Sequence, residues 1–244
     1  MLGGIQDNRL FIPCPTIQQR RFDKQIRSCP LDCSFFYGCC KQAHNKTAPG
    51  VGFVPCHQIS VVFTDGACSN NGRAGASAGY GIVLGTNDYQ QISRPLGDVI
   101  GLKTSQRAEL SAAHAGLVSG AEHCRIHISK EKRARAPAHA KKQLVLLTDS
   151  EYVVRGMTEW LPKWKMNGFR TSAGKEPANL ALFLSLEEQI EDYEAEEFEI
   201  GFMHIPRRFN QVADRLAKLA AEADKSPVAS AMANLNEDLD IQGI

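Results

Sequence analysis

The sequence predicts an α/β protein in which helices pack against a mixed β-sheet. Two observations predict this class. Strand-like apolar segments occur five times between Ile59 and Ile205, and stretches of helical apolar periodicity separate the later ones. The first three strand segments follow one another directly, as in a meander, whereas the last two alternate with helices. This order gives a mixed sheet with helices on its faces.

The elements follow in chain order. Strands are expected at residues 59–64, 78–85, 89–97, 143–148 and 198–205. Helices are expected at 104–120, from Asp149 or Ser150 onward, at 177–193 and at 210–223, with a broken helical stretch over 158–169. Thr104 or Ser105 can cap the first helix. The strand QLVLLT at 143–148 is almost entirely apolar, which is typical of a sheet centre buried on both faces.

The composition is that of a soluble globular protein with one or two domains, since 43% of the 244 residues are hydrophobic and 23% are charged. Lys and Arg number 28 against 27 Asp and Glu, so the net charge indicates no partner. The sequence has no apolar run of membrane-spanning length and no secretory signal pattern. We therefore expect an intracellular monomer, nuclear or cytoplasmic.

Charge and cysteine content divide the chain into three expected parts. Residues 1–57 form a basic Cys-rich extension, expected to be poorly ordered, with seven Lys/Arg against three Asp/Glu. Residues 58–224 form the folded domain, and residues 225–244 a disordered tail. The domain contains an exposed basic loop at 129–142, which either contacts phosphates or is a solvated insertion. A segment of opposite sign, 187–199, carries eight acidic residues and no basic one.

Six of the eight cysteines lie in the extension, at positions 14, 29, 33, 39, 40 and 56. Without a signal peptide, reduced thiols are expected in place of a disulfide framework. Cys29, Cys33, Cys39, Cys40 and His44 are candidate zinc ligands, but their spacing lacks the short C-x₂-C knuckle. We favour incidental cysteines and leave a zinc site open.

The stretch VVFTDGACSNNG at 61–72 leads an apolar strand into Asp65 and then into turn-forming residues. Asp-Gly is a common turn, so Asp65 can simply begin one. Alternatively, its carboxylate holds a metal ion beside backbone that a ligand can approach closely. Asp149 repeats the arrangement after LVLLT. If the two strands are parallel neighbours, both carboxylates lie together at the strand ends where α/β proteins bind ligands.

Two further acids lie on predicted helices. Glu109 shares a helix face with small residues, so it either faces close-packed protein or lies at the rim with its head in water. Asp214 lies close to the apolar side of the last helix. Each acid alone can be a surface group. Four gathered carboxylates would repel one another, and a hard divalent cation such as Mg²⁺ or Mn²⁺ would relieve that repulsion.

The ordered set DGACSNNG, TSQRAEL, LLTDS, W-x₃-W with FRTSAGKEPAN, and HIP with ADRLA resembles ribonuclease H type 1 over roughly residues 58–223. The resemblance implies an RNase H-like fold, with a five-stranded mixed sheet flanked by helices. It implies an endoribonuclease that cleaves the RNA strand of RNA–DNA hybrids with two Mg²⁺ ions, Mn²⁺ being a possible substitute, and leaves 5′-phosphate and 3′-hydroxyl ends. The implied catalytic and metal-ligating residues are Asp65, Glu109, Asp149 and Asp214.

The resemblance also implies residues that bind the hybrid. Asn71 and Gln106 match minor-groove contacts, and Ser105 stands where the family usually has Asn. Trp160, Trp164 and Ser172 match a channel for the DNA strand, although two Trp can also be ordinary core residues. Thr104 and Asn179 match a pocket for a DNA phosphate, from which the usual Arg is missing, because Leu102 stands there beside Lys103.

Other functions remain open at this stage: a non-catalytic hybrid-binding module, an RNase H domain of retroelement origin, and an exonuclease of related fold. The chain also departs from the family near Asp214. The connection PRRFNQVA at 206–213 is short and holds no His, where many members have a flexible His-containing loop. We expect His204, inside the last strand, to be structural, and Arg207 and Arg208 to attract phosphate.

Overall fold

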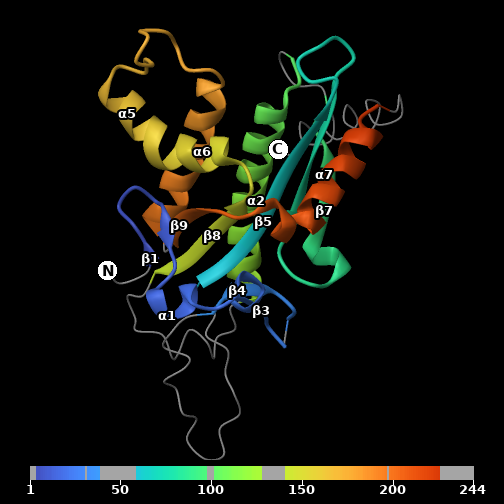
Figure 1. The fold of residues 1–244 in the computed structure, drawn as a ribbon, viewed down its shortest axis with the longest axis vertical. Coiled ribbons are helices and arrows are strands. Elements are labelled where there is room, and N and C mark those ends of the chain that lie inside the picture. Colours follow the sequence, from blue (N-terminus) through green and yellow to red (C-terminus); the bar gives the residue numbers. More distant parts are fainter. Residues whose placement is uncertain are drawn as a thin grey trace, which may run out of the picture.

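The computed structural model describes residues 4–30, 32–38, 59–97, 102–127, 141–196 and 198–225 (Figure 1). At its centre β5 (Ile59–Ser69) pairs antiparallel with β6 (Ser77–Val83), and β6 pairs antiparallel with β7 (Gln91–Pro95). On its other edge β5 pairs parallel with β8 (Lys142–Thr148), and β8 pairs parallel with β9 (Phe198–His204). The predicted mixed sheet is confirmed with its five predicted strands, although the sheet has seven strands among the described residues.

Helices cover both faces of this sheet. α2 (Ser105–His127) and α6 (Leu180–Glu196) pack with each other over one face, where Val62, Ile82 and Leu146 belong to the main core. α7 (Gln211–Ala223) packs on β5, β6 and β7 from the opposite face. There a Cβ added to Gly81 would lie 2.3 Å from the carbonyl oxygen of Ala213. Figure 1 shows α6 on the left of the sheet and α7 on the right.

The broken helical stretch that the sequence predicts lies between β8 and α6. α4 (Glu151–Arg155) begins after Ser150, whose hydroxyl accepts from the backbone N–H of Val153 and caps the helix. One π-helical turn, η4 (Gly156–Trp160), leads directly into α5 (Leu161–Met166). Pro162 stands in the first turn of α5, directly after the π-helical turn, so its missing N–H interrupts the helical hydrogen bonds where the helix changes its form.

Strand β5 is longer than the sequence predicts. It continues to Ser69, five residues past the expected end at Thr64, and Asp65 pairs with Gly81 of β6. The parallel pairing with β8, however, stops at Phe63 opposite Leu147. Asp65 therefore lies where β8 ends, although its own strand goes on.

Residues 4–30 and 32–38 are folded, in contrast to the expectation of a poorly ordered extension over residues 1–57. β1 (Gly4–Ile5) and β2 (Phe11–Ile12) form a small antiparallel hairpin, followed by the short helix α1 (Pro15–Gln18). A 3₁₀ turn, η1 (Phe22–Lys24), precedes β3 (Ile26–Ser28), which pairs antiparallel with β4 (Phe35–Tyr37). Phe36 of β4 pairs with Ser60 of β5, so β3 and β4 extend the central sheet.

This N-terminal segment covers part of the second face of the sheet. Phe11, Ile17 and Tyr37 are buried against Val145 and Leu147 of β8. The sequence predicts that residues 58–225 fold alone and are active. The packing argues against this prediction. Removing residues 4–38 would expose apolar side chains of β8 to water, and each Å² of exposed apolar surface costs ~25 cal/mol of folding free energy.

Several sequence predictions fall on other parts of the chain. Cys39, Cys40, His44 and Cys56, the basic loop at 129–140 and the tail at 226–244 lie outside the described residues. Across the ranges that are described, no helix is long and apolar enough to cross a membrane.

Candidate active site

The register of the sheet brings Asp65 and Asp149 to the same level. The last β5–β8 pair is Phe63 with Leu147, and each Asp lies two residues further along the chain. Asp65 is 5% exposed, and the side chain of Asp149 is 11% exposed. The two strands are parallel neighbours, as the sequence predicts, but only β8 ends here, because β5 continues to Ser69.

Gly66 explains how Glu109 reaches the same place. A Cβ on Gly66 would lie 2.2 Å from the carbonyl carbon of Ala108 and 2.3 Å from the backbone nitrogen of Glu109. Only a glycine lets the backbone of α2 touch β5 directly beside Asp65. The sequence predicts that the turn-forming residues after Asp65 let a ligand approach the backbone. At Gly66, the missing side chain instead makes room for the backbone of α2.

The small residues beside Glu109 are buried as predicted, with Ala108, Ala112 and Ala113 at 0% exposure. Oε2 of Glu109 is also buried and accepts no hydrogen bond from any described residue. A buried carboxylate oxygen without a donor costs free energy unless another group, such as a cation, satisfies it.

The charges of the acids act on one another. Burial, followed by the negative charges of Asp149 and Asp214, raises the pKa of Asp65 to about 7. Burial, followed by the charges of Asp65 and Asp149, raises the pKa of Glu109 to about 8. Two carboxyls that titrate near neutral pH for these reasons are characteristic of functional sites.

Asp214, in the first turn of α7, is neutralised by the chain itself. Its Oδ1 accepts from Arg207 at 2.6 Å, and its Oδ2 accepts from Lys218 at 2.6 Å. Although burial opposes the effect, the hydrogen bonds from Lys218 and Arg207 lower the pKa of Asp214. Nε of Arg207 also lies 4.0 Å from Oδ2 of Asp149, so this guanidinium links two of the four acids.

Asn210 is a site residue that the sequence analysis missed. It is 1% exposed, and its Nδ2 donates to Oδ1 of Asp149 at 2.6 Å and to the carbonyl of Thr64 at 3.0 Å. It occupies the N-cap of α7 without capping that helix through its side chain. The available signal was therefore an Asn four residues before Asp214, in a cap position.

Two more partners fix the acids. Ser150 hydrogen-bonds Glu109 and thereby opposes the increase of its pKa. Nε2 of His204 lies 3.2 Å from the backbone carbonyl of Asp149, to which it can donate. This contact agrees with the structural role that the sequence predicts for His204, since it fixes the backbone beside Asp149.

The donor set fits hard divalent cations. Asp65, Glu109, Asp149 and Asp214 offer oxygen atoms only, and Glu109 has an unsatisfied buried oxygen. Within the described ranges, no three Asp, Glu, His or Cys side chains already converge as a metal cage. Arg207 and Lys218 hold the carboxylate of Asp214.

One group of predicted hybrid-binding residues is brought together at the N-terminus of α2. Oγ1 of Thr104 accepts from the N–H of Arg107, which confirms Thr104 as a cap. Oδ1 of Asn71 accepts from the N–H of Ser105 at 2.9 Å, so the loop after β5 is tied to the helix start. Asn71 and the next residue of the helix, Gln106, are both exposed.

The two Trp are half-buried neighbours. Their ring centroids are 6.2 Å apart, and Trp164 packs edge-on against Phe183 of α6 at 5.4 Å. Trp160 contacts Tyr152 and the guanidinium of Arg155. Each ring therefore has a packed side and some accessible surface. The packed side agrees with a core role, and the accessible surface leaves room for the predicted contact with the DNA strand.

The remaining predicted contacts stay predictions. Ser172 is exposed in the turn after α5. Asn179 has a positive φ of 58°, and its Nδ2 donates to the hydroxyl of Tyr152 at 3.0 Å. The side chain of Thr104 caps α2, and that of Asn179 bonds Tyr152. The phosphate pocket that these two residues are predicted to share therefore remains a prediction.

The model of the family described as RNase H matches residues 57–222. The chain belongs to the RNase H family. It is 36% identical over 166 residues to Ribonuclease H1 of Mus musculus, covering 66% of this chain and 50% of that protein. It thus spans about half the length of that relative. It is 32% identical over 161 residues to Ribonuclease H of Vibrio cholerae, covering 66% of this chain and 87% of the bacterial protein.

Two solved RNase H domains are also similar to this chain. The RNase H domain of PFV is 24% identical, with a TM-score of 0.48, and covers 67% of this chain and 94% of that domain. The N-terminal RNase H domain of rv2228c from Mycobacterium tuberculosis, fused to maltose binding protein, is 25% identical, with a TM-score of 0.41, and covers 67% and 98%.

Proposed function

We propose that this RNase H chain is an endoribonuclease that hydrolyses the RNA strand of RNA–DNA hybrids. The observation that carries the proposal is the crowding of buried and half-buried acids at the carboxyl end of β8, beside Asp65 of β5. The register places Asp65 beside Asp149, and Gly66 admits Glu109. The membership of the RNase H family supports the substrate class.

In this proposal Asp65, Glu109, Asp149 and Asp214 hold two Mg²⁺ ions, with Mn²⁺ as a substitute. Two such ions, when bound, lower the pKa of a water and stabilise charge on the departing 3′ oxygen, which leaves 5′-phosphate and 3′-hydroxyl ends. Asn210 and His204 keep Asp149 in place, one through its carboxylate and the other through its backbone carbonyl.

Arg207 is an internal counter-ion for Asp149 and Asp214, and a divalent cation held by these acids would compete with it. Its side chain is 71% exposed, so the released guanidinium can turn to solvent at low cost. There it can pair with a phosphate of the substrate, since a guanidinium binds phosphate oxygens in a bidentate manner. This role replaces the His-containing loop that the chain lacks.

The hybrid is expected to lie across the exposed residues that flank the acids. Asn71, Ser105 and Gln106 would read 2′-hydroxyls in the minor groove, and Trp160, Trp164 and Ser172 would contact the DNA strand. Thr104 and Asn179 would contact a phosphate of the DNA strand.

A cleavage assay tests the proposal. Blunt RNA–DNA hybrid, RNA duplex and single-stranded DNA of equal length are incubated with the full chain and Mg²⁺, with Asp149→Asn as the control for contaminating nuclease. We expect internal cleavage of the RNA strand of the hybrid only, with 5′-phosphate ends. Binding of the hybrid without cleavage would support a non-catalytic module, and shortening from the ends of DNA would support an exonuclease.

A further inference from the structure

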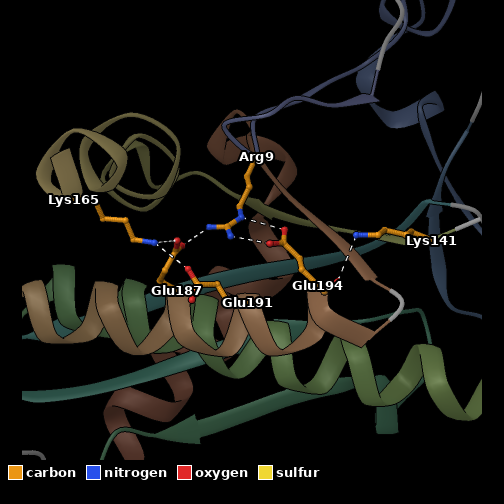
Figure 2. A network of polar contacts seen from close by, with 6 residues as sticks. All are labelled: Arg9, Lys141, Lys165, Glu187, Glu191 and Glu194. Atoms are coloured by element: carbon orange, nitrogen blue, oxygen red, sulfur yellow. Dashed lines mark hydrogen bonds and ion pairs between the residues drawn. The ribbon is translucent and has the colours of Figure 1, made fainter.

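The N-terminal hairpin is joined to the helix pair that carries the predicted DNA channel. Nε and a terminal nitrogen of Arg9 form two parallel bonds with the carboxylate of Glu194, at 3.1 and 2.8 Å. The other terminal nitrogen of Arg9 donates to Glu187. Figure 2 shows the guanidinium between the two carboxylates, which project from α6. Paired bonds of this kind fix orientation as well as charge.

Glu187 is shared between two cations. Its Oε2 accepts from Arg9, and its Oε1 accepts from Lys165, which comes from α5. Lys165 also bonds Glu191 at 3.0 Å. Figure 2 shows Lys165 and Arg9 approaching Glu187 from opposite sides. We call Arg9, Lys165, Glu187, Glu191 and Glu194 the α6 clamp.

The clamp is well placed to set the position of α5. A cavity of about 490 Å³ lies among the hairpin, α5 and α6, with Pro162 and Lys165 of α5 in its wall. On this side of α5, ion pairs bridge an open space that apolar packing does not fill. α5 also contacts α6 through Trp164, whose ring packs edge-on against Phe183, one helical turn before Glu187. Trp164 is therefore the neighbour of Lys165 in α5 that also packs on the helix of the clamp.

The hairpin itself is held firmly enough to act as an anchor. The backbone N–H of Phe202 in β9 donates to the carbonyl of Arg9 at 2.8 Å, and Leu10 bridges to Phe202 in parallel. Arg9 has a positive φ of 65°, fixed by a bond from its N–H to the carbonyl of Gln6. The sheet edge thus positions the guanidinium that meets α6.

We infer that Arg9 is a positioning residue, which orients Glu187 and through it Lys165, and so sets α5 and Trp164 for binding the hybrid. The inference rests on the proposed function for its substrate. The inference also accounts for the opposite charges of the N-terminal segment, which is basic, and of residues 187–199, which are acidic. Glu187 is 8% exposed, and without Arg9 its buried carboxylate would keep one cation instead of two.

The test compares Arg9→Gln with Arg21→Gln in the full chain. Arg21 is the matched control, because it lies in the same segment, loses the same charge, and is 84% exposed in its pair with Asp23. For Arg9→Gln we expect KM for the hybrid to rise ~5-fold, kcat to change less than twofold, and amide exchange in α5 to become ~10-fold faster. Arg21→Gln should change none of these.

A double variant separates positioning from simple attachment. If Arg9 acts through Glu187 and Lys165, then adding Arg9→Gln to Lys165→Gln should raise KM no further. Glu194→Gln removes one partner of Arg9 and leaves Glu187 intact, so it should raise KM and the amide exchange of α5 by a smaller factor. This variant replaces Arg9→Gln in the test if Arg9→Gln does not fold. A folded Arg9→Gln or Glu194→Gln protein with unchanged KM and unchanged exchange in α5 would overturn the inference. If the native chain fails to cleave hybrids, the proposed function falls, while the exchange of α5 still decides whether the clamp positions it.

Discussion

The active site and the α6 clamp are both clusters of carboxylates, yet the chain neutralises them differently. In the clamp, Arg9 and Lys165 bond the carboxylates of Glu187, Glu191 and Glu194. At the active site, the pKa values of Asp65 and Glu109 are raised by burial and by neighbouring acids, and Oε2 of Glu109 has no partner among the described residues. The clamp is thus complete within the chain, whereas in our proposal the active site takes up a cation from outside.

The largest effect is expected from Asp149→Asn. An amide is a poorer ligand than a carboxylate and leaves the charge of a bound cation unbalanced, so cleavage of the hybrid should fall by ~1,000-fold or more. Circular dichroism and thermal unfolding should show an intact fold, because the amide oxygen can still accept from Asn210. Full cleavage by this variant in Mg²⁺ would contradict the assignment of the acids.

This difference between the clusters was only partly predictable from the sequence. The sequence indicates the four acids because Asp65 and Asp149 follow similar apolar strands, and Glu109 and Asp214 lie near apolar helix faces. The approach of α2 to β5 at Gly66 and the buried amide of Asn210 were missed, since both depend on contacts between segments far apart in the chain.

The N-terminal segment was the largest departure from expectation. Phe11, Ile17 and Tyr37 follow no helical or strand period, so they gave no local signal. The signal lay elsewhere, in the strand at 143–148, which is apolar on both faces and therefore needs cover on both. The acidic stretch at 187–199 likewise needed cations, which the clamp supplies in part from Arg9.

The next effect tests the clamp as a stabilising cluster. Glu187→Ala should lower the free energy of unfolding by about 2 kcal/mol, because it removes the shared partner of two partly buried cations. Glu188→Ala is the control, since Glu188 is exposed on the same helix and should change stability by less than ~0.5 kcal/mol. Urea unfolding of both variants gives the comparison. Equal losses would show that the clamp has no special role in stability.

A smaller effect is expected when the internal cation is removed from the active site. Arg207→Gln should strengthen Mn²⁺ binding by ~3- to 10-fold in a calorimetric titration without substrate. The reason is that a guanidinium no longer competes with Mn²⁺ for the carboxylates of Asp149 and Asp214. Arg208→Gln is the control, since Arg208 lies over the ring of Phe209. Unchanged or weaker ion binding in Arg207→Gln would show that the guanidinium is not a competitor.

The smallest effect is expected at His204. Its ring bonds the backbone carbonyl of Asp149, so His204→Ala should lower kcat by ~2- to 5-fold and leave every limb of the pH profile near neutral in place. A folded variant that lost ~100-fold or more, on the scale of a missing acid–base group, would show that His204 transfers a proton in the reaction.

The most direct test of the comparison is the pH dependence of unfolding, with and without Mg²⁺. The folded pKa values of Asp65 and Glu109, about 7 and about 8, exceed the ordinary values of 3.8 and 4.5. Between these limits the folded protein keeps protons that the unfolded chain has released, so its stability falls as the pH rises. The free energy of unfolding in urea is measured for the native protein and for Glu109→Gln, each at pH 5 and pH 8.5. Subtracting the change of the variant from that of the native protein cancels the contributions of the other titrating groups.

Without metal, the native protein should lose about 4 kcal/mol more than Glu109→Gln between these two pH values. Saturating Mg²⁺ should remove that extra loss, because the ion binds the ionised carboxylates of the folded state. A native protein that follows the variant at both pH values, and that gains no stability from Mg²⁺ at pH 8.5, would contradict the claim that its active-site acids await an external cation.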